Sequence, residues 1–156
     1  MKCLSEIKNL VTDVDGVLTD GGFYYDETGK VLKKFGPHDS DGFKIITSLG
    51  INCFAISADR RGFGITQRRL NDMGIPISLV SEKERFSWIS ENVGFDGTCF
   101  IGDGYHDVSS IEQATLGIAP VNAPDFVKSS ADIVTKAQGG NGVIFEVALM
   151  LKERVK

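Results

Sequence analysis

Cysteine and proline are both scarce in this chain. Only three cysteines occur in 156 residues, and no two of them form a Cys-x-x-Cys pair, so a disulfide framework is not expected. Because disulfides mark oxidising compartments, this usage favours a reducing, cytoplasmic location. The four prolines form no proline-rich linker, so nothing in their distribution indicates a boundary between domains.

Long apolar runs and basic clusters are also missing. No stretch approaches the roughly 18 apolar residues of a membrane helix, and the N-terminal MKCLSEIKNL has charges where a signal peptide needs its apolar core. Basic residues form only short pairs, and the formal net charge is -4. Neither nucleic acid nor a membrane is therefore expected as a partner. An acidic protein that binds a phosphate ester needs local positive charge, most simply a metal ion and one lysine.

The composition that is present suits one ordinary globular domain. Apolar residues make up 42% of the chain, which is enough for one continuous core without a structural metal. A length of 156 residues is typical of one domain, and we predict a single domain over residues 1–156.

Short apolar runs alternate with helical patterns along most of the sequence. Strands are predicted at residues 9–14, 51–57, 75–80, 98–103, 116–121 and 131–135. Helices are predicted at residues 42–49, 63–73, 83–93, 107–114 and 142–154. This alternation is typical of an α/β fold, a Rossmann-like doubly wound parallel sheet with helices on both faces.

One segment departs from this alternation. Residues 21–35 read as two strands around the turn Glu27-Thr28-Gly29, which predicts a β-hairpin inserted into the first crossover. A two-stranded hairpin is marginal alone, and its aromatic residues Phe23, Tyr24 and Tyr25 would be partly exposed on a monomer. Either a neighbouring subunit or the hairpin's own domain could cover them.

Polar residues close several of the predicted strands. Asp13 and Asp15 end the first strand in DVDGV, Ser57 ends the second, and Asp103 and Asp107 follow the fourth in GDGYHD. In an open parallel sheet, ligands bind at the carboxyl ends of the strands. We expect these side chains to face one crevice.

The spacing of these carboxylates predicts a cation. Asp13 and Asp15 would repel each other unless a positive charge lay between them, and GDGYHD supplies further carboxylates for a hard oxygen site that suits Mg2+. Such an ion would neutralise a phosphate ester while one aspartate attacks phosphorus and a second transfers protons. Lys83 could add positive charge at the phosphate, and Ser57 could donate a hydrogen bond.

Each motif also has a simpler explanation when taken alone. An Asp-x-Asp sequence could only cap a turn, and GDG could be only a tight turn. Ser57 could be an N-cap and Lys83 a solvated helix residue. His38 and His106 lie beside these segments, where a surface role is commoner than catalysis. The combination of all the motifs in one chain favours a functional site.

In order and approximate spacing, DVDGV, Ser57, Lys83 and GDGYHD resemble the four motifs of haloacid dehalogenase phosphatases. The resemblance implies that Asp13 is the nucleophile and Asp15 the acid/base residue. It also implies that Asp103 completes a Mg2+ shell with Asp13 and the backbone carbonyl of Asp15.

The same resemblance implies roles in binding. Ser57 and Lys83 would hold the phosphate of the substrate, and Asp107 would be a supporting carboxylate. Asp39, in the segment HDSDGF, would lie near the mouth of the pocket; from the sequence alone, Asp39 or Asp41 could equally be the N-cap of the following helix.

A closer likeness is to a small capless branch of that family, which includes phosphatases of 3-deoxy-D-manno-octulosonate 8-phosphate and of nonulosonate 9-phosphates. It is carried by DGVLTDGGFYYDETGKVLKKF, HDSDGF and GGNGVIFEV. The likeness implies a haloacid dehalogenase-like fold without a large cap domain, a sugar-phosphate substrate and a homotetramer formed through the hairpins. The short spacing from Asp15 to Ser57 and on to Asp103 agrees with the lack of a cap.

Departures from the pattern of that branch concern substrate choice. Asp59 stands where arginine is typical, and its carboxylate is expected to repel a sugar-acid carboxylate. Asn141 and Phe145 stand where arginines are common, and Gly104 replaces a frequent aspartate.

Two other functions fit parts of the pattern. The chain is similar to the phosphatase-like domain of some acylneuraminate cytidylyltransferases, which would make it a catalytically weak oligomerisation module. A module without catalytic activity has no physical reason to keep four charged residues together, so their presence favours an enzyme; the four are Asp13, Asp15, Lys83 and Asp103. A phosphomutase would transfer the phosphoryl group to a second hydroxyl, but mutases of this superfamily usually carry a cap.

Overall fold

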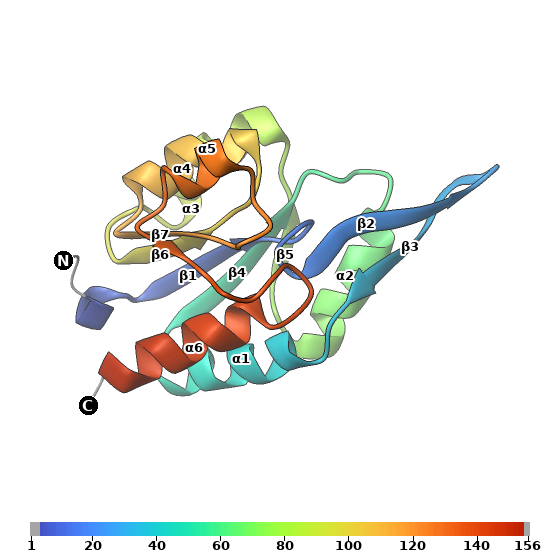
Figure 1. The fold of residues 1–156 in the computed structure, drawn as a ribbon. Coiled ribbons are helices and arrows are strands. Elements are labelled where there is room, and N and C mark those ends of the chain that lie inside the picture. Colours follow the sequence, from blue (N-terminus) through green and yellow to red (C-terminus); the bar gives the residue numbers. More distant parts are fainter. Residues whose placement is uncertain (1–3, 155–156) are drawn as a thin grey trace.

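The computed structural model describes residues 4–154 and contains a parallel sheet between two layers of helices (Figure 1). The strands are β1 (Asn9–Asp13), β4 (Asn52–Ser57), β5 (Ile77–Leu79), β6 (Thr98–Ile101), β7 (Leu116–Ala119) and β8 (Ile133–Val134). They lie in the order β5-β4-β1-β6-β7-β8, and every neighbouring pair is parallel. The predicted doubly wound α/β fold is confirmed.

Each face of the sheet is covered by its own set of helices. One layer contains α1 (His38–Ser48), α2 (Phe63–Met73) and α6 (Val143–Arg154). The other contains α3 (Arg85–Asn92), α4 (Val108–Gln113) and α5 (Asp125–Lys128). Single turns of 3-10 helix occur at η1 (Leu4–Glu6), η2 (Glu82–Glu84) and η3 (Tyr105–Asp107). None of the described helices is long and apolar enough to cross a bilayer.

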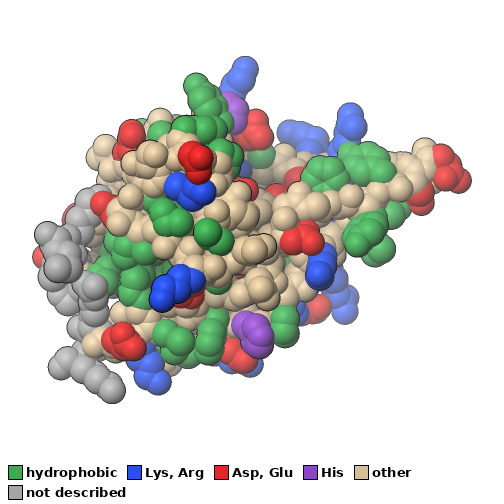
Figure 2. Space-filling view, viewed as in Figure 1, with side chains coloured by type: hydrophobic (Ala, Val, Ile, Leu, Met, Phe, Trp, Pro, Cys, Tyr) green, Lys and Arg blue, Asp and Glu red, His purple; other side chains and the backbone are tan. Residues whose placement is uncertain are grey.

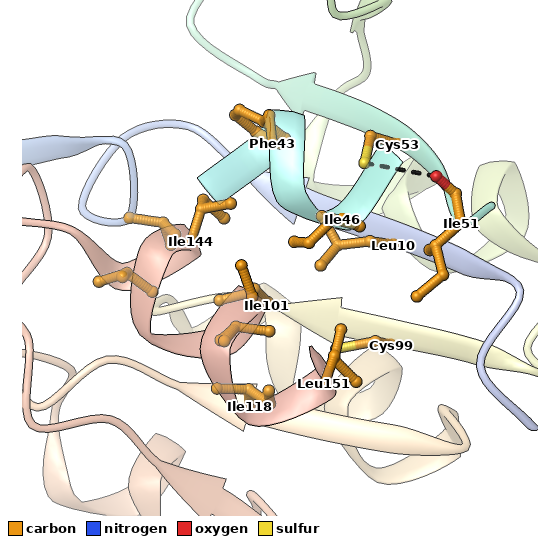
Figure 3. Close-up of a cluster of buried hydrophobic side chains, with 14 of the residues drawn as sticks. Leu10, Phe43, Ile46, Ile51, Cys53, Cys99, Ile101, Ile118, Ile144 and Leu151 are labelled. Carbon is orange, nitrogen blue, oxygen red and sulfur yellow. Dashed lines mark hydrogen bonds between the residues drawn. The ribbon is translucent and has the colours of Figure 1, made fainter. Parts of the chain in front are cut away.

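The core is divided by the sheet because successive strand residues point to opposite faces. In β1, Leu10 packs in the cluster under α1 and α6, whereas Val11 packs in the cluster under α3 and α4. Both are fully buried. Figure 3 shows the first cluster, where Ile46 and Ile144 from the two helices meet Leu10. Burying a side chain of this size stabilises the fold by roughly 1.5–3 kcal/mol.

Helices α1 and α6 approach each other closely at Gly42. A Cβ atom at Gly42 would lie 2.6 Å from the backbone nitrogen of Phe145 and 2.7 Å from the carbonyl carbon of Ile144. Those are backbone atoms, which cannot move aside as a flexible side chain would. The absence of a side chain at Gly42 therefore allows the beginnings of the two helices to lie side by side.

The predicted hairpin is present as β2 (Thr19–Asp26) and β3 (Gly29–Phe35), an antiparallel pair. It projects from the body of the molecule (Figure 1), and apolar side chains lie on its surface (Figure 2). Tyr24 is 63% exposed and Leu32 is 59% exposed. Within the described chain, these two side chains are not covered by the hairpin's own domain. Coverage by a neighbouring subunit stays a prediction.

Element boundaries differ from expectation at three places. Helix α1 begins at His38, directly after Pro37, rather than at residue 42, so Asp39 and Asp41 lie in its first turn instead of preceding it. Acidic side chains favour the positive end of the helix dipole, which supports this early start. The predicted helix at residues 83–93 begins with the 3-10 turn η2. The short helix α5 was not predicted, because four residues are too few to show periodicity.

Candidate active site

The loop that follows β1 is held rigidly by its own backbone. The carbonyl of Val14 accepts hydrogen bonds from the N–H groups of Val17, Leu18 and Thr19. The Thr19 hydroxyl in turn accepts one from the N–H of Gly16 at 3.1 Å. Gly16 has φ = 89°, which disfavours any residue with a side chain. This turn places Asp13 and Asp15 at the carboxyl edge of the sheet.

The loop after β6 is shaped by Asp107. One oxygen of this buried carboxylate accepts hydrogen bonds from the backbone N–H groups of Asp103 at 3.0 Å and Gly104 at 2.9 Å. A Cβ atom on Gly16 would overlap the Asp103 carboxylate. Gly16 therefore lets the two strand-end loops touch and brings the side chain of Asp103 beside the end of β1.

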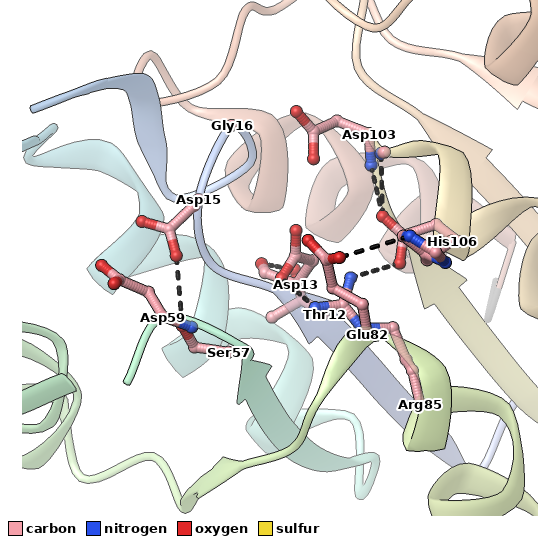
Figure 4. A network of polar contacts seen from close by, with 12 residues as sticks. Thr12, Asp13, Asp15, Gly16, Ser57, Asp59, Glu82, Arg85, Asp103 and His106 are labelled. Carbon is pink, nitrogen blue, oxygen red and sulfur yellow. Dashed lines mark hydrogen bonds and ion pairs between the residues drawn. The ribbon is translucent and has the colours of Figure 1, made fainter. Parts of the chain in front are cut away.

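Three carboxylates converge at this point, and two of them, Asp13 and Asp103, are labelled in Figure 4. Asp13, Asp103 and Asp107 each offer an oxygen, and these atoms all lie within 4.8 Å of one another. Burial, reinforced by repulsion from Asp107, Asp103 and Asp15, raises the pKa of Asp13 well above its ordinary value, although Arg85 opposes the shift. Burial together with Asp107 raises the pKa of Asp103 to about 6. The cluster is short of positive charge, so it suits a cation.

The buried cation of this cluster is Arg85. Its guanidinium contacts Asp107 Oδ1 at 2.5 Å and Asp13 Oδ1 at 3.2 Å. Burial alone would lower the pKa of Arg85, but Asp13 and Asp107 outweigh burial and raise it, so the group stays charged. Arg85 was not predicted from the sequence. Lys83, the residue that was predicted instead, is exposed in η2 and lines the cavity above, with no ion pair or side-chain hydrogen bond among the described residues.

The carboxylate of Asp15 is held from two sides. Ser57 donates a hydrogen bond to Asp15 Oδ2 at 3.1 Å (Figure 4), and the ammonium of Lys33 lies 2.7 Å from Asp15 Oδ1. Lys33 is on the hairpin strand β3 and was not predicted. The alternation in KVLKKF could have indicated that Lys33 and Lys34 face opposite sides of the strand, but not which lysine faces the site.

The charge of Asp59 is compensated by the hairpin. Asp59 Oδ2 lies 2.5 Å from Lys30 Nζ and 2.8 Å from Lys33 Nζ. Burial opposes ionisation here, but hydrogen bonds from Lys30 and Lys33 outweigh it and lower the pKa of Asp59 to about 2. Two ammonium groups therefore lie against the Asp59 carboxylate, which weakens the repulsion of a sugar-acid carboxylate that was expected from it.

One cavity of about 680 Å3 is lined by most of these groups, although not by Ser57 or Lys33. Its lining residues come from the strand ends, the hairpin and the loops η2 and η3: Asp13, Asp15, Phe23, Lys30, Ala58, Asp59, Ser81, Glu82, Lys83, Arg85, Asp103, Gly104, Tyr105, His106 and Asp107. Two of the lining side chains contact each other, His106 Nε2 and Glu82 Oε2 at 3.3 Å. The arrangement can bind an anion and offers two aspartates for its chemistry.

Comparison with known proteins agrees with this geometry. The profile of the haloacid dehalogenase-like hydrolases matches residues 89–147. The 3-deoxy-D-manno-octulosonate 8-phosphate phosphatase of Haemophilus influenzae is 33% identical over 153 residues, which are 95% of this chain and 84% of that protein. The chain belongs to this phosphatase branch of the haloacid dehalogenase-like hydrolases. The enzyme of the same name from Escherichia coli K12 is 29% identical over 93% of this chain and 79% of that protein.

Solved structures of haloacid dehalogenase-like phosphatases share the whole fold. The cobalt-bound form of the Haemophilus influenzae enzyme superimposes with a TM-score of 0.85 at 32% identity, over 97% of this chain and 90% of that one. The Moraxella catarrhalis enzyme, in complex with magnesium, phosphate and the octulosonate sugar, gives a TM-score of 0.87 at 26% identity, over 97% of this chain and 88% of that one. No large cap interrupts the described part of this phosphatase.

Asp39 lies elsewhere in this phosphatase than the resemblance implied. Its carboxylate is 2% exposed and accepts a hydrogen bond at 2.9 Å from the N–H of Ile144 in the first turn of α6. It is not among the described residues that line the cavity. The carboxylate joins the beginnings of α1 and α6, so its contacts indicate a structural role. Asn141 and Phe145, two of the departures, lie in the same region and likewise do not line the cavity.

We expect Asp39→Asn to stabilise this phosphatase at pH 7.5 and not at pH 4. Burial raises the pKa of Asp39 to about 6, so the folded state binds a proton more readily than the unfolded chain. The carboxylate therefore costs stability above pH 6, and the cost disappears as the pH falls towards 4. Asparagine keeps an oxygen that can accept the hydrogen bond from Ile144 but carries no charge. The gain in the free energy of unfolding at pH 7.5 should be about 1–2 kcal/mol, after the cost of burying an unpaired amide N–H is subtracted.

Urea unfolding of both proteins between pH 4 and 7.5 measures this difference. Asp41→Asn, on the exposed side of the same helical turn, is the matched control, and its stability at pH 7.5 should stay within about 0.5 kcal/mol of the parent's. A stability difference for Asp39→Asn that stays constant with pH would contradict the assignment.

Proposed function

We propose that this phosphatase hydrolyses a sugar phosphomonoester through an aspartyl-phosphate formed on Asp13. One observation carries the proposal: Asp13 is the last residue of β1, at the base of the cavity, within reach of Asp103, Asp107 and the buried Arg85. A nucleophile in such a place can meet a phosphoryl group that enters from solvent. The Arg85 guanidinium, together with a cation bound by the carboxylates, can offset the charge on the phosphoryl oxygens.

The residues of the cluster fit Mg2+. Three carboxylate oxygens within 4.8 Å are a hard donor set of the kind this ion prefers. Both oxygens of Asp107 already have partners, Arg85 on one side and two backbone N–H groups on the other. We therefore propose that Asp13 and Asp103 hold the ion together with the backbone carbonyl of Asp15, and that Asp107 supports them. When bound, Mg2+ supplies positive charge that offsets the charge of the phosphoryl oxygens.

The reaction divides between two aspartates. A carboxylate oxygen of Asp13 attacks phosphorus, the bond between phosphorus and the ester oxygen breaks, and Asp15 gives its proton to that oxygen. Asp15 then takes a proton from a water molecule whose oxygen attacks the same phosphorus. The bond to Asp13 breaks, inorganic phosphate leaves, and both side chains return to their starting states.

The neighbours of these aspartates position them. Arg85 fixes the orientation of Asp13, whereas Ser57 and Lys33 hold Asp15 from two sides. The Ser57 hydroxyl has one donor hydrogen, which it gives to Asp15, so its predicted hydrogen bond to the phosphate requires that hydrogen to turn from Asp15 to the phosphate. Lys83, at the rim of the cavity, is proposed to approach the phosphate from outside.

The proposed substrate is a 3-deoxy-ulosonate phosphate, either an octulosonate 8-phosphate or a nonulosonate 9-phosphate. Support comes from the Haemophilus influenzae relative, whose name specifies the octulosonate ester and of which this chain covers 84%. Compensation of Asp59 by Lys30 and Lys33 removes the electrostatic objection to a sugar acid. Assembly as a cytoplasmic homotetramer is proposed with it, because Tyr24, Tyr25 and Leu32 give the hairpin an uncovered apolar surface.

Phosphate release from a panel of sugar phosphates tests the proposal. With Mg2+ present, we expect turnover of the ulosonate phosphates and at least about 10-fold lower kcat/KM for neutral sugar phosphates, the margin expected from one charged contact. Excess EDTA should abolish turnover, and added Mg2+ should restore it. Because a ligand that binds only the folded state stabilises it, Mg2+ should also raise Tm.

Each failure has a distinct meaning. Turnover that is the same in EDTA would contradict the metal site. Equal activity on all esters would leave a phosphatase but contradict the ulosonate assignment. No turnover of any ester, with no response of Tm to Mg2+, would favour the oligomerisation module.

A further inference from the structure

Lys30, Lys33 and Asp59 form a cluster on one side of the cavity that the proposed mechanism leaves largely unused. In Figure 4, Asp59 lies on the opposite side of Asp13 from Asp103 and His106. The lysines come from β3 of the hairpin, and Asp59 follows β4. Both Lys30 and Asp59 line the cavity, so a substrate whose phosphate reaches Asp13 can extend towards them.

Lys33 has no hydrogen-bond donor left for a substrate. An ammonium group carries three N–H bonds, and three acceptors surround this one: Asp15 at 2.7 Å, Asp59 at 2.8 Å and the Thr66 hydroxyl at 2.9 Å. Its side chain is fully buried. Lys33 is therefore a fixed link between the hairpin and Asp15.

Lys30 differs from Lys33 in this respect. Its ammonium contacts Asp59 at 2.5 Å and lies 3.9 Å from the centre of the Phe23 ring. Across residues 4–154, its ammonium has no other acceptor within hydrogen-bond distance. Two of its three donors remain. The carboxylate of Asp59 is shared between Lys30 and Lys33, and Lys33 has Asp15 as a second partner.

The position of Lys30 is fixed before any ligand arrives. The Asp59 carboxylate accepts a hydrogen bond from the N–H of Gly62 at 3.1 Å, and the backbone N–H of Asp59 donates one to the Ser57 hydroxyl at 3.2 Å. The Phe23 ring lies against the Lys30 ammonium. A cation held in place in this way loses little conformational entropy when it binds an anion. An ammonium with spare donors at the wall of a cavity suits a single carboxylate.

We propose that Lys30 is a specificity-determining residue, which donates hydrogen bonds to the carboxylate of the substrate on the side of the cavity away from Asp103. The inference rests on the proposed function, because it assigns the contact for the acid group of the ulosonate phosphate. Asp59 is the positioning residue that holds Lys30 there. The hairpin thus contributes to substrate selection within its own subunit.

Lys30→Met tests this contact, with Lys34→Met as the matched control. Lys34 is exposed on the same strand, and its loss changes the net charge equally. For the ulosonate phosphate, we expect Lys30→Met to lower kcat/KM about 10- to 100-fold, as for loss of one charged hydrogen bond. For a neutral sugar phosphate, the change should stay within about 3-fold. Lys30→Arg should keep the preference for the acid, and Lys34→Met should behave as the parent.

Direct binding makes the test independent of turnover. Calorimetric titration with the free 3-deoxy-ulosonate, which has the carboxylate but no phosphate, should show weaker binding to Lys30→Met than to the parent and Lys34→Met. Equal loss of activity on acidic and neutral esters, or unchanged binding of the free acid, would overturn the assignment of Lys30. If the parent enzyme does not prefer the ulosonate phosphate to the neutral sugar phosphate, the proposed substrate is overturned. If the parent prefers the ulosonate phosphate and Lys30→Met keeps the same preference, only the role of Lys30 is overturned.

Discussion

Asp13→Asn is expected to lower kcat by about 10^4-fold or more without loss of the fold, because the amide cannot attack phosphorus. Asparagine has nearly the same shape as aspartate, so the end of β1 and the loop beyond it should keep their hydrogen bonds. Burial raises the pKa of Asp13, which means that its ionised form is costly in the folded state. The neutral variant should therefore be at least as stable as the parent.

Phosphate release and thermal unfolding, measured on the same preparations, separate these two effects. Asp96→Asn changes an acidic residue in the loop before β6, and Asp96 is not among the described residues that line the cavity, so it should keep full activity. If Asp13→Asn retained more than about a tenth of the parent's activity, Asp13 could not be the nucleophile. If Asp13→Asn were inactive because it did not fold, its thermal scan would show no cooperative unfolding transition.

The fold and the positions of the acidic motifs could be predicted because they depend on local patterns. Strands buried on both faces read as short apolar runs, and a polar residue that ends such a run must lie at the edge of the sheet. Asp13, Asp103 and Asp107 were found by this rule, and the structure brings their oxygens within 4.8 Å of one another. The strand-helix alternation predicted a sheet with helices on both faces, although not the first residue of α1.

The cations around the site could not be assigned from the same patterns. Lys83 and Arg85 are two residues apart at a helix start, and only the 3-10 turn η2 decides that Arg85 is the one buried. Lys33 reaches Asp15 across a hairpin whose orientation depends on tertiary contacts with Asp59 and Thr66. Asp39 was misplaced for a similar reason, since its partner in α6 lies 105 residues along the chain.

Arg85 provides the second large effect, on stability as well as activity. Arg85→Met removes the cation between Asp13 and Asp107, and a buried charge left without its partner typically costs about 3–5 kcal/mol. In metal-free buffer at pH 7.5, we expect urea unfolding to show a loss of this size. Turnover of the remaining folded enzyme should fall by about 100-fold, because Asp13 loses the group that orients it.

Two companion variants show whether charge or shape is responsible. Arg85→Lys keeps the charge, but its single ammonium cannot reproduce the two-sided contact of the guanidinium, so its stability should lie between those of the parent and Arg85→Met. Asp107→Asn combined with Arg85→Met removes one of the stranded carboxylates and should recover part of the lost stability, a positive coupling in a double-mutant cycle. If Arg85→Met cost less than about 1 kcal/mol, or if the cycle were additive, the guanidinium would not be what neutralises Asp13 and Asp107.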